Sequence, residues 1–191
     1  MGMTLVGLSF GVGVYLCYLT LEAQNVKNSR IVSWLGRLLV LTGFLMCIGL
    51  FAVATNPTGH LRRDGGWFWV ILVPHLLGAV MFFSAGIFMM TVLTLATYLI
   101  QRPNWLTMLF VVRLVVLSTS MLGGLMVLVG LPSIEGIKQL KPSPEHGRIY
   151  PPGTTVSAVG EWLVVLTFMF FVGTFIPTFA RTKITLIVDY K

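Results

Sequence analysis

The chain has 191 residues, of which 56% are hydrophobic and 10% are charged. Soluble domains are about 45–50% apolar and about 25% charged, so this composition excludes a disordered tail, a fibrous repeat and an ordinary water-soluble enzyme. It favours a polytopic membrane protein. The net charge is +7, but the basic residues lie singly between apolar runs rather than on one face. That pattern indicates contact with lipid headgroups and argues against a nucleic-acid partner.

Five apolar runs are long enough to cross the roughly 30 Å of bilayer hydrocarbon as helices. The sequence therefore predicts an all-α fold, a polytopic membrane helical bundle with five transmembrane helices, as a single transmembrane domain over residues 1–191. The third run is longer than a bilayer requires, so its helix is expected to tilt or project, and Pro177 is expected to kink or end the last helix. The expected helices cover residues 3–21, 32–54, 67–100, 105–131 and 154–179.

An odd number of spans places the two ends of the chain on opposite sides of the membrane. Lysine and arginine are somewhat more frequent in the connections on the side of the C-terminus than in those on the other side. Because basic residues are enriched in cytoplasmic connections, the sequence predicts a cytosolic C-terminus.

Three ionisable residues lie well inside the predicted helices: His75, Arg113 and Glu161. Charged groups in hydrocarbon are costly, and they usually pair with one another or line a cavity. Counted from the predicted helix ends, Glu161 and Arg113 differ in depth by roughly 8 Å, which a long arginine side chain can bridge. We therefore expect an ion pair between Arg113 and Glu161 with His75 nearby. Such a cluster is either a structural lock between helices or a catalytic or transport site, and the sequence leaves both readings open.

The remaining sequence motifs do not indicate a specific reaction or ligand. No nucleophile elbow, Walker loop, dinucleotide fingerprint or zinc-protease motif occurs in the sequence, so no catalytic set, cofactor or metal site is predicted. Considered alone, His75 is expected to cap a helix or to pack in the interior rather than to bind a metal or cofactor. Gly7 and Gly11 have the small-x-x-x-small spacing that lets helices approach closely, and Gly78 is expected to serve helix packing in the third helix.

Several of these residues carry a resemblance to a known family. His75-Leu-Leu-Gly78-Ala79 resembles the H-x-x-G-A element of the DRAM family, the damage-regulated autophagy modulators that are grouped with the Frag and Sfk membrane proteins. Arg113 in the next helix is similar to that family's arginine in the corresponding helix. The stretch from Ser157 to Trp162 resembles its A-x-x-E-W element, and the phenylalanine-rich run after it resembles the family's last helix. The resemblance covers roughly residues 5–188.

The resemblance implies that the three intramembrane polar residues are the family's own polar positions. It implies six helices, of which this chain begins at the second. The family's roles include autophagy modulation at lysosomes, support of a phosphoinositide kinase at the plasma membrane, and lipid remodelling of GPI anchors. We therefore expect an endomembrane location, such as the lysosome, or the plasma membrane.

The expected function is that of a non-enzymatic integral membrane protein, a scaffold, regulator or accessory subunit of a membrane complex. Its expected partners are membrane lipids and other membrane proteins or further copies of the chain, with no nucleic acid. Two alternatives stay open at this level. One is a lipid-handling enzyme or carrier that uses His75 and Glu161. The other is a channel or proton-coupled transporter that uses Arg113 and Glu161.

Overall fold

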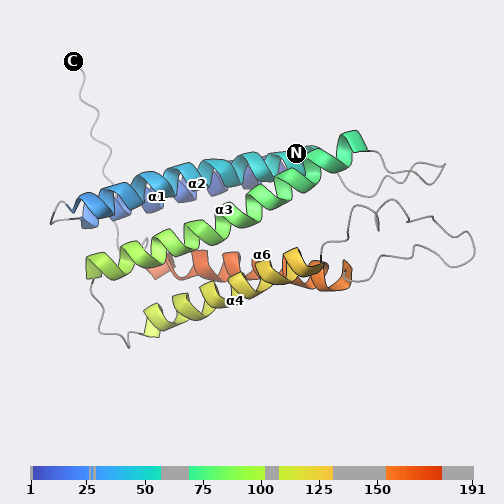
Figure 1. The fold of residues 1–191 in the computed structure, drawn as a ribbon. Helices are drawn as coiled ribbons and strands as arrows, with labels where there is room; N and C mark the ends of the chain where they lie inside the picture. Colours follow the sequence, from blue (N-terminus) through green and yellow to red (C-terminus); the bar gives the residue numbers. More distant parts are fainter. Residues whose placement is uncertain are drawn as a thin grey trace, which may run out of the picture.

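The computed structural model describes residues 2–25, 27, 29–56, 69–101, 108–130 and 154–177, with the side chains of 2–9, 69, 101 and 154 left out. Every regular element within these ranges is a helix, so the all-α prediction is confirmed for this part of the chain. Figure 1 shows the helices running back and forth along one common direction. They are α1 (Gly2–Gln24), α2 (Arg30–Thr55), α3 (Trp69–Gln101), α4 (Met108–Gly130) and α6 (Thr154–Gly173).

Within the described residues, four helices are long and apolar enough to cross a membrane, namely α2, α3, α4 and α6. Five transmembrane helices are therefore not confirmed, and the crossing of the membrane by α1 stays a prediction. At 33 residues, α3 is longer than the approximately 20 residues that a bilayer requires.

The helices form two groups that α3 joins. The first helix α1 packs on α2, and α2 packs on α3, while α4 and α6 form a close antiparallel pair (Figure 1). Contacts of α3 with α4 and α6 connect the two groups. The interior contains fully buried apolar side chains from α2, α3 and α6: Leu39, Met46, Met90, Val164 and Phe171.

Threonine side chains in these apolar helices are satisfied by their own backbone. The hydroxyl of Thr42 donates to the carbonyl of Leu38 at 2.9 Å, and the hydroxyl of Thr94 donates to the carbonyl of Met90 at 2.8 Å. Because hydrocarbon offers no water to a hydroxyl, this bond to a residue one turn earlier lets a polar residue remain in a membrane helix.

Two pairs of glycines bring helix backbones into direct contact. A Cβ atom added at Gly78 of α3 would lie 2.8 Å from the carbonyl oxygen of Gly49 in α2. A Cβ atom added at Gly160 of α6 would lie 2.6 Å from the carbonyl oxygen of Gly123 in α4. Larger residues at these positions would force the helices apart, so the glycines set the spacing and the register of both helix pairs.

In α1, the glycines whose surroundings are described do not bring the helix backbone into direct contact with another helix. A Cβ atom at Gly11 would meet the Sγ atom of Cys47 at 3.6 Å, which is ordinary van der Waals contact. The surroundings of Gly7 lie outside the described side chains. Of the three glycines predicted to serve helix packing, Gly78 lies at a close contact between backbones.

A buried asparagine fixes the connection between α1 and α2. The side-chain oxygen of Asn25 accepts a hydrogen bond from the backbone N–H of Ser29 at 2.9 Å. Its amide group donates to the carbonyl of Ser29 and to the hydroxyl of Ser33, both at 3.2 Å. Because Asn25 satisfies backbone groups at the start of α2, the two helices are held as a tight hairpin.

The last helix is shorter than the sequence predicts. Residues to 179 were expected to be helical, but α6 ends at Gly173, followed by a turn at Thr174 and Phe175. Pro177 lacks the N–H group that would bond to the carbonyl of Gly173 in a continuing helix, which favours this end. Residues 178 and 179 lie outside the described part.

Candidate functional site

Arg113 lies in the interior of the bundle, where its side chain is only 2% exposed. Its Nε atom donates to the hydroxyl of Thr174 at 3.0 Å, and Nη2 donates to the carbonyl oxygen of the same residue at 3.3 Å. Nη1 donates to the hydroxyl of Thr97 at 2.9 Å. One guanidinium group on α4 therefore connects α3 to the end of α6.

The two threonines are arranged to accept these bonds. The hydroxyl of Thr97 donates to the carbonyl of Leu93 at 2.8 Å, and the hydroxyl of Thr174 donates to the carbonyl of Phe171 at 2.6 Å. Each hydroxyl uses its proton within its own chain segment and so presents a lone pair to Arg113. Within the described residues, each guanidinium nitrogen of Arg113 thus has an acceptor that is not a carboxylate.

Two further features favour a cation at this place. The guanidinium carbon of Arg113 lies 3.9 Å from the centre of the Phe175 ring, a cation–π contact. The carbonyl of Thr174 follows the last turn of α6, where helical carbonyls lack partners and the helix dipole favours positive charge. Arg113 thus acts as the C-terminal cap of α6.

His75 closes the end of α2. Its Nδ1 atom lies 2.7 Å from the carbonyl oxygen of Asn56, the residue that follows α2. A carbonyl oxygen can only accept, so Nδ1 carries the proton in this contact. The contact joins the end of α2 to the first turns of α3, and it fits the helix-cap reading of this histidine.

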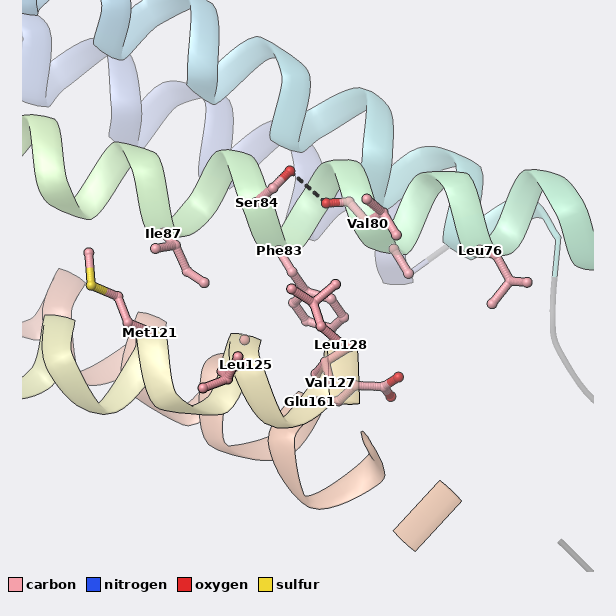
Figure 2. Close-up of a pocket in the computed structure, with 12 residues that line it drawn as sticks. Leu76, Val80, Phe83, Ser84, Ile87, Met121, Leu125, Val127, Leu128 and Glu161 are labelled. Carbon is pink, nitrogen blue, oxygen red and sulfur yellow. Dashed lines mark hydrogen bonds between the residues drawn. The ribbon is translucent and has the colours of Figure 1, made fainter. Parts of the chain in front are cut away.

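Glu161 occupies a different environment from Arg113. Its side chain is exposed and lies at one end of a groove of about 350 Å³ between α3, α4 and α6. Figure 2 shows the carboxylate at the end of the groove opposite Met121 and Ile87. Within the described residues, it makes no hydrogen bond or ion pair, and it interacts electrostatically with His75.

The groove is apolar apart from this acid. The hydroxyl of Ser84 also faces it but donates to the carbonyl of Val80 at 2.7 Å, as the dashed line in Figure 2 shows. Glu161 is therefore the charged residue of the lining. The walls include side chains from α3 and α4: Leu76, Phe83, Ile87, Met121, Leu125 and Leu128.

The predicted ion pair between Arg113 and Glu161 is wrong. Arg113 binds Thr174, and Glu161 lies more than three helical turns before Thr174, roughly 20 Å along α6 at about 1.5 Å per residue. The contact between Gly123 and Gly160 fixes this register, because it places Glu161 at a level of α4 well beyond Arg113.

The direction of the side chains widens the separation. The Cα–Cβ bond in a helix tilts towards the helix N-terminus. Because α4 and α6 are antiparallel, Arg113 and Glu161 point towards opposite ends of the bundle. The structure thus brings His75 and Glu161 within electrostatic reach of each other and leaves Arg113 outside that pair.

Sequence reasoning missed the partners of Arg113. Thr97, Thr174 and Phe175 look like ordinary residues of apolar helices, and no spacing in the sequence singles them out. The signal that was available is the placement of Thr174 and Phe175 shortly before Pro177. A proline there predicts a helix end, and therefore carbonyl groups that need donors.

No group of three metal-binding side chains occurs among the residues that the structure describes. At the Glu161 end, the described side chains of α3 and α6 give one exposed carboxylate and one histidine that already caps a helix. This pair resembles a binding arrangement more than a complete acid–base set, since the hydroxyl in the described lining of the groove, that of Ser84, donates to its own helix backbone.

Long apolar helices, an interior locked by a single arginine and a groove open along the bundle define a multi-pass helical membrane protein. Residues 1–182 match the family model described as the Frag1/DRAM/Sfk1/Cwh43P N-terminal domain. The chain therefore belongs to this family, as its motifs suggested. No curated protein and no solved structure matches it.

Proposed function

We propose that the protein is a non-enzymatic integral membrane protein that acts as a scaffold, regulator or accessory subunit of a membrane complex. The observation that carries this proposal is that the buried Arg113 directs its hydrogen bonds to Thr97 and Thr174 and packs on the Phe175 ring. A charged arginine is the group that costs most free energy to bury in a membrane helix. In the described helices the buried arginine, Arg113, joins helices and does not face a substrate.

The outer faces of α2 and α6 support an interaction role. Large side chains project from them, with Trp34 63% exposed on α2 and Trp162 68% exposed on α6. Phe44 and Phe170 are similarly exposed further along the same helices. Such faces suit contact with lipid or with the helices of another membrane protein.

The location belongs to the same proposal. The family includes proteins of lysosomes and the plasma membrane, so we assign this chain to an endomembrane compartment or the plasma membrane, with a cytosolic C-terminus. A part in autophagy is the corresponding cellular role. Fold does not determine function, so these assignments rest on family membership and on the distribution of basic residues.

The two alternatives fare differently. A channel or proton-coupled transporter would need Arg113 and Glu161 along one path, and their separation by roughly 20 Å of helix weakens that reading. A lipid-handling role gains support from the groove, because Glu161 is one of the residues that line it.

Purification of the tagged protein from its native membrane in mild detergent, followed by native mass spectrometry, tests the proposal. A stoichiometric protein partner is expected. The matched variant Trp162→Ala should weaken that association if α6 is the contact face, whereas Trp34→Ala tests α2 in the same way. Recovery of the chain alone or only with copies of itself, from several membrane sources, would contradict an accessory-subunit role.

A further inference from the structure

The groove between α3, α4 and α6 has the dimensions of a lipid chain. Along α3 it extends from Leu76 to Ile87, about three helical turns, or roughly 16 Å. Half of the bilayer hydrocarbon is about 15 Å thick. An acyl chain of a single leaflet therefore matches the groove in length.

Contacts between α3 and α4 lie beyond one end of the groove. Near the Arg113 end, the bond from Arg113 to Thr97 and the ring contact of Tyr98 with Phe110 at 5.9 Å hold α3 against α4. Towards the other end the two helices diverge (Figure 1). A chain entering from the Glu161 end would run towards the locked end.

Glu161 supplies the charge complementarity. Its carboxylate lies at this other end, where the headgroup of a lipid inserted chain-first would be (Figure 2). A carboxylate in apolar surroundings favours a cation that carries N–H donors, because the hydrogen bond adds to the charge attraction. A primary amine meets this need, and a quaternary ammonium has no N–H to donate.

We propose that this groove binds one acyl chain of a membrane lipid whose primary-amine headgroup pairs with Glu161. The lipid is bound without chemical change. The inference does not depend on the scaffold role, because neither Trp34 nor Trp162 lines the groove.

The test uses the full-length protein in lipid nanodiscs. Two photo-crosslinking phospholipids are compared that share the same diazirine-bearing acyl chain and differ only in an ethanolamine or a choline headgroup. We expect labelled peptides from the groove walls on α3 and α4, with ethanolamine lipid preferred about tenfold, which corresponds to about 1.4 kcal/mol. Equal labelling by both lipids, or labelling spread evenly over the outer faces of α2 and α6, would overturn the proposal.

Variants of the protein distinguish the contribution of the lipid headgroup from that of the acyl chain. Glu161→Gln should reduce the preference to near onefold, and Glu161→Asp should retain most of it. Gly124→Leu should remove groove labelling by both lipids, since its Cβ meets the flexible end of Ile87 at 2.8 Å and the rest of the new side chain fills the groove. Leu122→Phe, on an exposed face of α4 outside the groove, serves as the matched control.

The remaining outcomes are equally decisive. An unchanged preference in Glu161→Gln would exclude the amine pairing, and full labelling in Gly124→Leu would exclude the groove as the binding place. Crosslinks from groove residues to another polypeptide would assign the groove to a protein partner instead. Failure to find a partner in the purification experiment would leave the labelling pattern unaffected, so the two proposals fail separately.

Discussion

Arg113 holds the end of α6 through Thr174, by one bond to the hydroxyl at 3.0 Å and one to the carbonyl oxygen at 3.3 Å. This relationship between a helix interior and a helix end explains how a buried arginine is stable without a carboxylate. The unpaired carbonyl needs donors, and the guanidinium group provides them in a fixed planar arrangement. Lysine would offer the charge without that geometry.

Removal of the hydroxyl of Thr97 should destabilise the bundle. In Thr97→Val, Nη1 of Arg113 loses its acceptor while remaining buried, so we expect the free energy of unfolding to fall by about 1–3 kcal/mol. Unfolding in mixed micelles with increasing SDS measures it. Thr94→Val is the matched control, because Thr94 is equally buried on α3 and donates only to its own helix. Equal losses in both variants would show that the contact with Arg113 contributes nothing.

Arg113 and Glu161 should act independently on stability. We expect Arg113→Leu to cost about 2 kcal/mol, since three hydrogen bonds in a membrane helix bundle are worth about 0.6 kcal/mol each. Glu161→Gln should change the free energy of unfolding by less than about 0.5 kcal/mol, because the side chain is exposed.

The double variant checks this independence. The two effects should add to within about 0.5 kcal/mol, as they do for residues without shared partners. A coupling energy above about 1 kcal/mol would mean that the two charges do interact in the folded protein.

The contact between Gly78 and Gly49 should tolerate no side chain. In Gly78→Ala the new Cβ would lie 2.8 Å from a backbone oxygen, so α2 and α3 must separate, at a cost of about 1–3 kcal/mol. Gly13→Ala is the control, because a Cβ there meets nothing within 4 Å and alanine favours a helix by up to about 1 kcal/mol. Thermal unfolding in detergent compares the two, and a loss at Gly13 as large as that at Gly78 would refute the close-packing account.

Ser120→Ala should stabilise the protein. The Ser120 hydroxyl is 0% exposed and has no hydrogen-bond partner within the described residues. An unsatisfied buried hydroxyl costs about 1–3 kcal/mol, so replacement by alanine should raise the free energy of unfolding by about 1 kcal/mol. Ser84→Ala, whose hydroxyl bonds to Val80, should change it little. A loss of stability in Ser120→Ala would show that the hydroxyl has a partner in the folded protein.

The sequence by itself determined the class of protein and the positions of its helices. Apolar runs longer than the bilayer is thick can satisfy their backbone in hydrocarbon only as helices, so α2, α3 and α4 follow from composition alone. The same energetic argument selected His75, Arg113 and Glu161, because charge in an apolar run is costly wherever the helix is placed.

Only the tertiary structure decided which of these residues meet. The glycine contact of Gly123 with Gly160 sets the register of α4 against α6, and side chains that tilt towards each helix N-terminus carry Arg113 and Glu161 apart. Counting residues from the end of a single helix gives the depth of a side chain in the membrane. It gives neither the register between two helices nor the direction in which the side chain tilts. Arg113 therefore locks one end of the bundle, and Glu161 faces an open groove at the other.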